Sequence, residues 1–486
     1  MELAALIRAL APEAVVGSAD ADVLDLAYDA RAVAPGALFF CVAGSHADGH
    51  DFASDAVANG AVALVVERQL EVDVPQLVVG DTRAAMAIAA DTFFGEPTKA
   101  LEIAGVTGTN GKTTTAFLLR SILEAAGRRP GLVGTVEWIV GRESRPAPHT
   151  TPEAIDLQRL FREMLTAGDE SAAVEASSHG SALRRLDRVR FDALVFTNLS
   201  QDHLDLHGTL EDYYAAKRRL FVGPQPPPAA VNVDGEWGRR LADELEAAHR
   251  APLVTFGLGS GAEVRAEGQQ LGVRGSAFRV AGIEIETQLR GGFNVENVLG
   301  AVAAGILLDI DEDAIAAGIA AVKGIPGRFE AVGEGQPFAV IVDYAHTPDS
   351  LDIVLQAARE MLPDMRSGRV IAVFGAGGDR DRGKRPLMGR VVRDRADLAI
   401  VTSDNPRTED PLAIIQDVLQ GAGMDVEIDP DRLSAIHRAI SLAGTGDVVV
   451  IAGKGHEQGQ DIGGVVQPFD DREVAREALR AAGFTP

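Results

Sequence analysis

The 486-residue chain has a single cysteine, Cys41, so no disulfide bond can form within it. It also lacks any stretch of about 18 consecutive apolar residues, which argues against a membrane-spanning helix. Its first residues, Met1-Glu2-Leu3, do not begin a secretory signal, because no basic segment followed by an apolar run is present. We therefore expect a cytoplasmic protein with no membrane partner.

Positive charge is scarce as well. The chain has 46 Lys and Arg residues against 71 Asp and Glu residues, which gives a net charge of −25. This balance opposes nonspecific binding to nucleic acid, so we expect no nucleic-acid partner, and we expect a monomer. Only six of the basic residues are lysines. A lysine that persists in an arginine-rich chain is a candidate for a compact charge on phosphate or a reactive amine.

The length predicts about three domains. Strand and helix patterns alternate along the chain, which predicts an α/β fold. Residues 1–98 form the first predicted domain, which ends at the linker Gly95-Glu96-Pro97-Thr98. Residues 99–326 form the second, and residues 327–486 form the third, after a break from Gly324 to Arg328.

A phosphate-binding layout lies at the start of the second domain. Leu101 to Val106 predicts a buried strand, a glycine-rich loop follows, and a helix begins near Thr113. In such a loop, backbone N–H groups and the helix N-terminus converge on phosphate oxygens. Lys112 would reach the β- and γ-phosphates, and the Thr113 hydroxyl would ligate Mg²⁺. The general motif has glycine where Val106 stands, so the loop is a short form, Gly108 to Thr114.

Polar residues follow the next predicted strands. Glu175 comes after the strand Ala172 to Val174, and His203 lies beyond the strand Phe191 to Phe196. Open α/β sheets bind ligands at the carboxyl ends of their strands, so both side chains are predicted partners of Mg²⁺ or of its waters. Between the phosphate loop and these strands, Thr151-Pro152 predicts the N-cap and first residue of a helix, a terminus that also binds anions.

Lys217 lies on a helix that we expect from the capping-box pattern at Thr209 to about Phe221. Tyr213, Lys217 and Leu220 fall at i, i+4 and i+7, so the lysine shares a face with apolar residues. Two interpretations stay open. Its stem packs while the ammonium reaches solvent, or the amine is desolvated and reacts with CO₂ to give a carbamate, an anion able to hold a second Mg²⁺.

The last third returns to the α/β pattern. Each predicted strand is followed by a polar or glycine-rich loop, and we expect these loops at one edge of a parallel sheet. The loop Gly375 to Gly378 lacks the full dinucleotide-binding fingerprint, so we do not expect it to bind a dinucleotide. The predicted strands are Ala339–Val342, Arg369–Phe374, Asp397–Thr402 and Asp447–Ile451.

Taken together, these motifs resemble the Mur ligases, ATP-dependent amide-forming enzymes of peptidoglycan synthesis. The resemblance extends from Asp29 to Glu457. Within the family, His149 to Pro152 and Asp404 to Arg407 are similar to the MurE group, which adds the third residue to UDP-N-acetylmuramoyl-L-alanyl-D-glutamate. Asp-Asn-Pro-Arg is the form found where that residue is meso-2,6-diaminopimelate instead of L-lysine. The other motifs that carry the resemblance are Gly108–Thr114, Glu175–His179, Thr197–Asp205, the helix of Lys217, Gly327-Arg328 and Asp343–His346.

The resemblance implies a small N-terminal α/β domain that binds UDP, a central P-loop ATPase-like parallel sheet and a C-terminal Rossmann-like α/β domain. It implies ATP binding by Gly108, Thr109, Asn110, Gly111, Lys112, Thr113 and Thr114, with Asn294 and Arg328 near the adenine and Asp343 near the ribose. It implies that the UDP-linked substrate contacts Arg31, Thr150, Thr151, Ser177 and Arg185. It implies that diaminopimelate contacts Arg380, Asp404, Asn405, Pro406, Arg407, Gly453 and Glu457.

The resemblance also implies a reaction through an acyl phosphate, with Lys112, Lys217, Glu175 and His203 as the catalytic set. Two Mg²⁺ ions would be held by Thr113, Glu175, His203 and a carbamylated Lys217. The C-terminal domain would close on the central one about a hinge at Ile325 to Arg328. One departure stands out: the family usually has Asp-Ser-Arg where this chain has Asp29-Ala30-Arg31, so a hydroxyl near the uridine is missing.

Other functions remain open from the sequence. The acceptor could be L-lysine. A folylpolyglutamate or cyanophycin-type ligase would share the ATP loop and the helix lysine, but it would lack Asp404 to Arg407. A non-catalytic ATP-gated binding protein would have no need of Glu175, His203 and Lys217.

Overall fold

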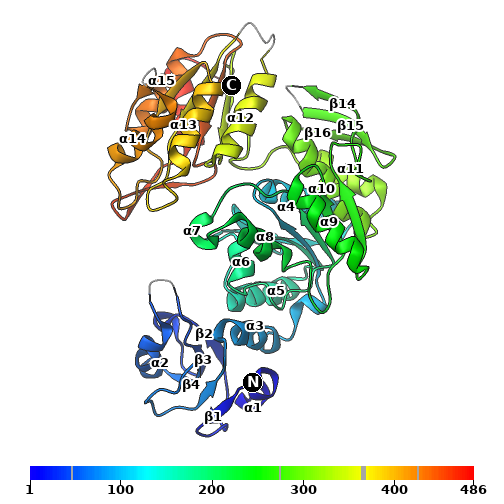
Figure 1. The fold of residues 1–486 in the computed structure, drawn as a ribbon, viewed down its shortest axis with the longest axis vertical. Coiled ribbons are helices and arrows are strands. Elements are labelled where there is room, and N and C mark those ends of the chain that lie inside the picture. The colour runs from blue at the N-terminus through cyan, green and yellow to red at the C-terminus, as the bar shows by residue number, and fades with distance from the viewer. Residues whose placement is uncertain (45–46, 273–274, 363–367, 424–425, 486) are drawn as a thin grey trace.

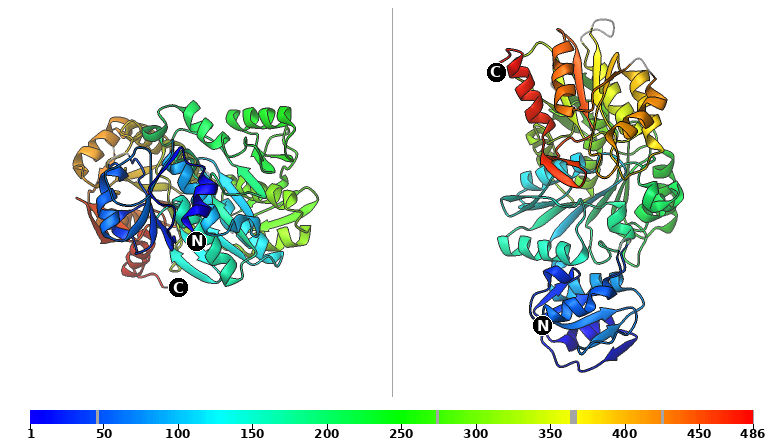
Figure 2. Two further views of the ribbon diagram at one scale, coloured as in Figure 1. Left: turned by 90° about the horizontal axis from the view of Figure 1, so that it is seen from below. Right: turned by 90° about the vertical axis from the view of Figure 1, so that its left-hand side faces the viewer.

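The computed structural model describes residues 1–44, 47–272, 275–362, 368–423 and 426–485. Three α/β bodies follow one another along its longest axis, with the N-terminal sheet at one end and the C-terminal sheet at the other (Figure 1). The side view shows the same succession (Figure 2). The three main sheets fall within the three ranges predicted from the sequence. The α/β class and the three-part architecture are thus confirmed, whereas the boundaries at residues 98 and 326 stay predictions.

The N-terminal sheet has five strands in the order β1-β5-β4-β3-β2, and only β1 is antiparallel to its neighbour. Cys41 directly follows β3 and is buried. The helices of this body are α1 (Leu3–Leu10), α2 (Ala53–Ala58) and α3 (Thr82–Phe93). Its strands are β1 (Ala14–Val16), β2 (Asp25–Ala27), β3 (Ala37–Phe40), β4 (Ala61–Val66) and β5 (Gln76–Val78).

The central sheet has eight strands in the order β13-β12-β11-β6-β10-β7-β8-β9, and only β8 and β9 run antiparallel to their neighbours. β6 lies between β11 and β10, so its apolar run Ile103 to Val106 is buried on both faces. The strands are β6 (Glu102–Thr107), β7 (Pro130–Val133), β8 (Glu137–Val140), β9 (Glu143–Pro146), β10 (Ser171–Glu175), β11 (Ala193–Phe196), β12 (Ala229–Asn232) and β13 (Leu253–Phe256).

Helices cover both faces of this sheet, and one core lies on each side. One core is formed with α4 (Lys112–Ala125), α10 (Gly292–Leu307) and α11 (Glu312–Ala321). The other is formed with α5 (Ala154–Ala167), α8 (Leu210–Arg218) and α9 (Glu236–Ala248). Two short helices, α6 (Ser178–Ala182) and α7 (Leu204–His207), follow β10 and β11, and a small antiparallel sheet of β14 (Glu267–Gly272), β15 (Gly275–Val280) and β16 (Ile283–Thr287) packs beside α11.

The C-terminal sheet has the order β17-β18-β22-β19-β20-β21 and is parallel except for β17. All four strands predicted for this region are present, with no end shifted by more than one residue. They are β18 (Ala339–Asp343), β19 (Val370–Phe374), β20 (Leu398–Val401) and β22 (Val448–Ala452), flanked by β17 (Glu330–Ala331) and β21 (Glu427–Ile428).

Two helical layers enclose the C-terminal sheet. α12 (Pro348–Glu360), α13 (Lys384–Arg395) and α14 (Pro411–Ala422) share one core, and α15 (Arg432–Leu442) and α16 (Asp471–Ala481) share the other. A hairpin of β23 (Gly459–Ile462) and β24 (Val465–Pro468) precedes α16. None of the helices in the described part of the chain is long and apolar enough to cross a membrane.

The helix start predicted at Thr151 was wrong. α5 begins at Ala154, and Glu153 occupies its N-cap position. The Thr151 hydroxyl instead donates to the carbonyl oxygen of Glu175 at 2.7 Å and accepts from the Ser177 N–H at 3.1 Å. Long-range hydrogen bonds therefore take the atoms that a local cap would have used. The helix predicted to run to about Phe221 is also shorter, because α8 ends at Arg218.

Candidate active site

A pocket of about 690 Å³ lies where the phosphate loop meets the C-terminal domain. It brings together 17 of the predicted site residues: Thr109, Asn110, Gly111, Lys112, Thr113, Thr114, Thr150, Thr151, Glu175, Ser177, Arg185, His203, Lys217, Arg328, Asp343, Arg380 and Glu457. Predicted residues outside its lining are Gly108, Asn294, Arg31, Asp404, Asn405, Pro406, Arg407 and Gly453. One cavity thus joins groups that are more than 300 residues apart in the chain.

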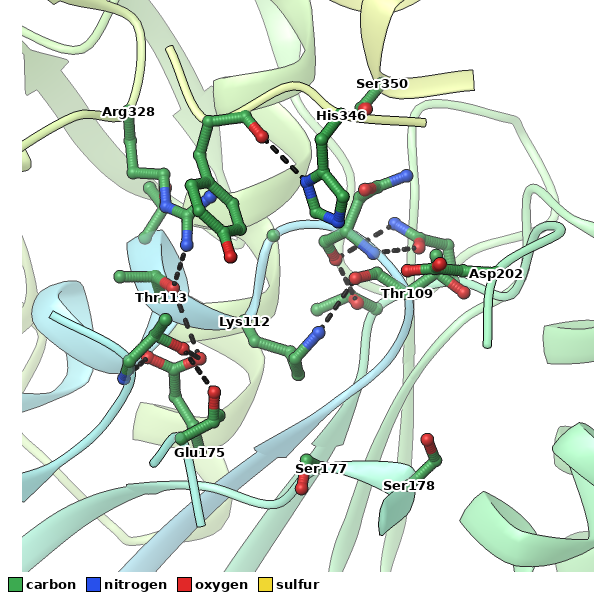
Figure 3. A pocket seen from close by; sticks show the side chains of 18 of the residues that line it. Thr109, Lys112, Thr113, Glu175, Ser177, Ser178, Asp202, Arg328, His346 and Ser350 are labelled. Carbon is green, nitrogen blue, oxygen red and sulfur yellow. Dashed lines mark hydrogen bonds between the residues drawn. The ribbon is translucent and has the colours of Figure 1, made fainter. Parts of the chain in front are cut away.

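The phosphate loop follows β6 and leads into α4, as predicted. Its two glycines are required by space: a Cβ on Gly108 would lie 1.9 Å from the Thr197 hydroxyl, and one on Gly111 would lie 2.2 Å from Asn297 Oδ1. The Lys112 ammonium folds back onto the loop and donates to the carbonyl oxygens of Gly108 at 3.1 Å and Thr109 at 2.8 Å (Figure 3). Burial lowers the pKa of Lys112.

Glu175 and Thr113 meet directly beside this loop (Figure 3). The Thr113 hydroxyl donates to Glu175 Oε2 at 3.2 Å, and the buried carboxylate also accepts from the N–H and hydroxyl of Thr135 at 2.8 and 2.9 Å. Mg²⁺ favours oxygen donors, and nucleotide sites commonly supply one or two of them besides the phosphates. The hydroxyl of Thr113 and the carboxylate of Glu175 are oxygen donors of this kind, so they fit an ion that phosphate oxygens also hold. Among the described residues, no group of three or more His, Cys, Asp or Glu is placed to hold a metal.

Lys217 is 1% exposed, which excludes the interpretation in which its ammonium reaches solvent. Its Nζ donates to the carbonyl oxygen of Gly108 at 2.7 Å and lies 4.5 Å from the centre of the Tyr213 ring. Burial, with the charge of Lys112 as a second cause, holds the pKa of Lys217 well below its usual value. The neutral amine, the form that reacts with CO₂, is therefore favoured, and the carbamate itself stays a prediction.

His203 lines the pocket among other aromatic and acidic side chains. Its Nε2 is 3.3 Å from Asp202, and its ring centre is 4.7 Å from that of His179. Burial lowers the pKa of His203 to about 3, although Asp202 opposes the shift. A neutral imidazole is the form that can accept a hydrogen bond or bind a cation. Sequence reasoning gave no role to Asp202 or His179, because nothing local distinguishes them.

The three residues predicted near the adenosine have other partners in this structure. The Arg328 guanidinium reaches the phosphate loop, where it donates to the Thr113 hydroxyl at 3.1 Å and lies over the Tyr344 ring (Figure 3). The Asp343 carboxylate accepts from two backbone N–H groups, and burial raises its pKa. Asn294 donates to the carbonyl oxygen of Arg290 at 2.7 Å. Arg328 thus lies at the phosphate end of the site, and the adenine and ribose contacts stay predictions.

Four of the residues predicted to bind the UDP-linked substrate form a connected wall of the pocket. The Thr150 hydroxyl is 3.0 Å from that of Thr135, and Arg185 donates to the Thr151 carbonyl oxygen at 2.8 Å. The Ser177 hydroxyl accepts from the Gly180 N–H at 3.0 Å. Arg31 is different: its side chain is 91% exposed, pairs with Asp29 and lies outside the pocket lining. Its substrate contact stays a prediction.

The loops predicted to bind the amino-acid substrate meet at the carboxyl edge of the C-terminal sheet. Asp404 to Arg407 follow β20, and Gly453 to Glu457 follow β22. Asn405 Nδ2 donates to Glu457 Oε2 at 2.8 Å, and a Cβ on Gly453 would lie 2.3 Å from Asp404 Oδ2. Arg407 has a left-handed backbone, with φ +52°, and donates to the carbonyl oxygen of Gly378 at 2.5 Å.

Lys454 is a site residue that the motifs did not assign. It is buried between the two loops and donates to Asn405 Oδ1 at 2.9 Å and Glu457 Oε2 at 3.1 Å. One signal for it was present in the sequence, because it is one of only six lysines. That signal did not indicate which chemical task the amine performs.

Comparison with known proteins agrees with this geometry. The family model described as "Mur ligase middle domain" matches residues 106–305, "Mur ligase, glutamate ligase domain" matches 327–455, and "Mur ligase family, catalytic domain" matches 25–94. A relative from Geobacillus kaustophilus is 48% identical over 478 residues, 95% of this chain and 96% of the relative. The chain belongs to the Mur ligase family. It is therefore an ATP-dependent amide-forming ligase.

Other relatives of this Mur ligase are similar over nearly its whole length. One from Streptomyces coelicolor is 45% identical and covers 99% of the chain and 96% of its own length. Both relatives are named UDP-N-acetylmuramoyl-L-alanyl-D-glutamate--2,6-diaminopimelate ligase. A solved structure of a protein with the same name is 35% identical, with a TM-score of 0.67 over 95% of this chain and 96% of that one. A folylpolyglutamate synthase from Mycobacterium tuberculosis, 20% identical with a TM-score of 0.63 over 83% of this chain and 96% of its own, shares the fold.

Proposed function

We propose that this Mur ligase joins meso-2,6-diaminopimelate to UDP-N-acetylmuramoyl-L-alanyl-D-glutamate with consumption of ATP, in the cytoplasmic synthesis of peptidoglycan precursors. The observation that carries the proposal is the contact of the Asp404–Arg407 loop, through Asn405, with Glu457, which lines the same pocket as the phosphate loop. Relatives at 45–48% identity bear the name of this activity.

The first step activates a carboxylate, which is otherwise a poor electrophile. A carboxylate oxygen of the D-glutamyl residue attacks the γ-phosphorus of ATP, the bond to the ADP oxygen breaks, and an acyl phosphate forms. Lys112 and Arg328 bring positive charge to the loop where the transferring group lies. Mg²⁺, held by Thr113 and Glu175, with His203 and a carbamylated Lys217 as direct or water-mediated partners, would neutralise phosphate charge in this site.

The second step forms the amide. The acceptor amine attacks the acyl carbon, its proton is lost, and inorganic phosphate leaves. The donor peptide is held along the wall of Thr150, Thr151, Ser177 and Arg185. Because the acceptor comes from the C-terminal domain, that domain closes on the central one about Ile325 to Arg328.

Acceptor choice rests on two opposite charges. Diaminopimelate carries a distal carboxylate together with a distal ammonium, and L-lysine lacks the carboxylate. The Arg407 guanidinium can pair with that carboxylate through two hydrogen bonds, while Glu457 faces an ammonium. L-lysine would leave Arg407 without its anion, so discrimination follows from a partly buried cation that only one substrate satisfies.

The test is phosphate release from ATP with the UDP-linked dipeptide and either meso-diaminopimelate or L-lysine, with the product identified by mass. We expect release and a tripeptide product with diaminopimelate alone. Turnover with L-lysine would still show ligase activity but would refute the role of Arg407. The absence of phosphate release with either acceptor would refute the proposed substrates. Arg407→Met should lose the preference, whereas Arg382→Met, at a nearby side chain that is 70% exposed, should keep it.

A further inference from the structure

Lys454 is a fully buried cation within the acceptor loops. Its side chain is 0% exposed, yet its ammonium lies 3.1 Å from Glu457 Oε2, on a side chain that is 32% exposed and lines the pocket. An ammonium is costly to bury unless its hydrogen bonds are satisfied, so this placement needs partners. It has two, Glu457 Oε2 and Asn405 Oδ1.

Both the oxygen and the nitrogen of the Asn405 side-chain amide are engaged in hydrogen bonds around Lys454 and Glu457. Its Oδ1 accepts from Lys454 at 2.9 Å and from the Asp461 N–H at 3.0 Å, and its Nδ2 donates to Glu457 Oε2 at 2.8 Å. Asn405 therefore binds within the protein through its amide and has little capacity left for a ligand.

Glu457 is held through one oxygen. Its Oε2 accepts from both Lys454 and Asn405, whereas no donor within the described residues reaches Oε1. A carboxylate fixed in this way is held in one orientation, and its residue lines the pocket. The lysine suits this task because its compact ammonium can donate to two oxygens at different angles, which a planar guanidinium cannot do in the same space.

We propose that Lys454 is a positioning residue that locks Asn405 and Glu457 into one unit, so that Glu457 Oε1 meets an ammonium group of the acceptor. The inference rests on the proposed function, because it takes Glu457 to be the group that receives the acceptor amine. Lys454 does not touch the acceptor, and its effect is transmitted entirely through Glu457.

The test uses the full-length enzyme and the Lys454→Met variant, with KM measured separately for each substrate. We expect the acceptor KM to rise roughly tenfold or more, the range for hydrogen bonds to a charged group, with the KM values for ATP and the UDP-linked dipeptide nearly unchanged. Lys323→Met, at an exposed lysine, is the matched control and should leave all three unchanged. An unchanged acceptor KM, or an equal rise in all three KM values, would overturn the proposal.

A double-mutant cycle separates positioning from an independent contribution. In a Glu457→Gln background, adding Lys454→Met should change the acceptor KM by less than about threefold, because the carboxylate that the lysine positions is already gone. If the two substitutions together raise the acceptor KM by the product of their separate effects, the proposal is overturned. If Lys454→Met does not fold, Lys454→Gln takes its place in the same cycle. It keeps a neutral donor but loses the ammonium charge, so we expect a smaller rise that is still confined to the acceptor KM.

Failure of this inference can be distinguished from failure of the proposed function. The cycle is run with whichever amine acceptor the wild-type enzyme turns over. Turnover with L-lysine alone refutes the diaminopimelate assignment, but the coupling between Lys454 and Glu457 is still measured with that acceptor.

Discussion

The Lys217 Nζ donates a hydrogen bond to the carbonyl oxygen of Gly108 at 2.7 Å, which joins helix α8 to the phosphate loop. Lys112, which is partly buried, donates to the same oxygen at 3.1 Å, so two amines converge on one acceptor. The charge of Lys112 is one of the causes that lower the pKa of Lys217. A carbamate on Lys217 would place an anion beside the charge of Lys112, and the two would attract each other.

The first prediction concerns that carbamate. Lys217→Ala should abolish synthesis, because it removes the anion proposed to bind metal, and added short carboxylic acids should restore part of the activity by supplying one. Phosphate release measured with and without acetate or formate checks this. Lys323→Ala, at an exposed lysine, is the control and should be fully active without added acid. Full activity of Lys217→Ala would refute the carbamate.

The second prediction concerns Gly453, which lies at φ +122° with the position of a Cβ 2.3 Å from Asp404 Oδ2. Gly453→Ala should raise the acceptor KM roughly tenfold because the new Cβ displaces Asp404, and it should add backbone strain of about 1–3 kcal/mol. Steady-state kinetics with each substrate varied in turn checks this.

Gly464→Ala is the matched control for this prediction. Gly464 also has a positive φ, +80°, but a Cβ there meets nothing within 4 Å. Both variants introduce backbone strain, and only Gly453→Ala adds the collision with Asp404. Equal effects on the acceptor KM would show that strain alone, and not the displaced carboxylate, is responsible.

Patterns within a short stretch predicted much of the site. The strand, glycine loop and helix at Glu102 to Ala125 were recognisable because hydrophobic period, glycine spacing and helix start all agree over about 24 residues. The face shared by Tyr213 and Lys217 likewise predicted a lysine among apolar groups, and the structure confirms its burial. In both cases the deciding information is local.

Side-chain contacts with residues far away in the sequence could not be predicted in this way. Arg328 reaches Thr113 from 215 residues away, and no local pattern indicates that contact. Thr151 carried a strong helix-cap signal, but hydrogen bonds with Glu175 and Ser177 overrode it. Lys454 was missed for the same reason, because its two partners come together only when β20 and β22 lie in one sheet.

The third prediction concerns the pH dependence of stability. Burial, with the nearby His179 as a second cause, lowers the pKa of His207 to about 4. The unfolded chain binds this proton near pH 6.5 and the folded protein does not, so the free energy of unfolding falls as the pH drops from about 6.5 toward 4. His207→Gln should show a smaller loss of stability between pH 7.5 and pH 5 than the wild type.

Urea titrations at the two pH values check this prediction. His249→Asn is the control: His249 is exposed with a left-handed backbone that asparagine tolerates, and its substitution should leave the pH dependence unchanged. An equal loss of stability in His207→Gln and the wild type would contradict the assignment.

The last prediction compares two ion pairs of helix α15. Arg432 and Asp471 are both 0% exposed and share two hydrogen bonds of 2.7 Å, whereas Arg438 and Glu427 are 51% and 50% exposed. Arg432→Met should lower the free energy of unfolding by about 3–5 kcal/mol, because it leaves the Asp471 charge buried and unpaired. Arg438→Met should cost about 0–1 kcal/mol. Chemical denaturation of both variants checks the contrast.

The loss of stability in Arg432→Met could come from the unpaired Asp471 carboxylate or from lost packing, and removing both charges of the buried pair distinguishes these two causes. Arg432→Met combined with Asp471→Leu should recover much of the stability, and a double variant as unstable as Arg432→Met alone would contradict the charge argument. Arg432 also donates to the carbonyl oxygens of Ser403 and Ala452, which precede the two acceptor loops. The double variant should therefore regain stability while its acceptor KM stays raised, because neither new side chain can hold those carbonyl groups in place.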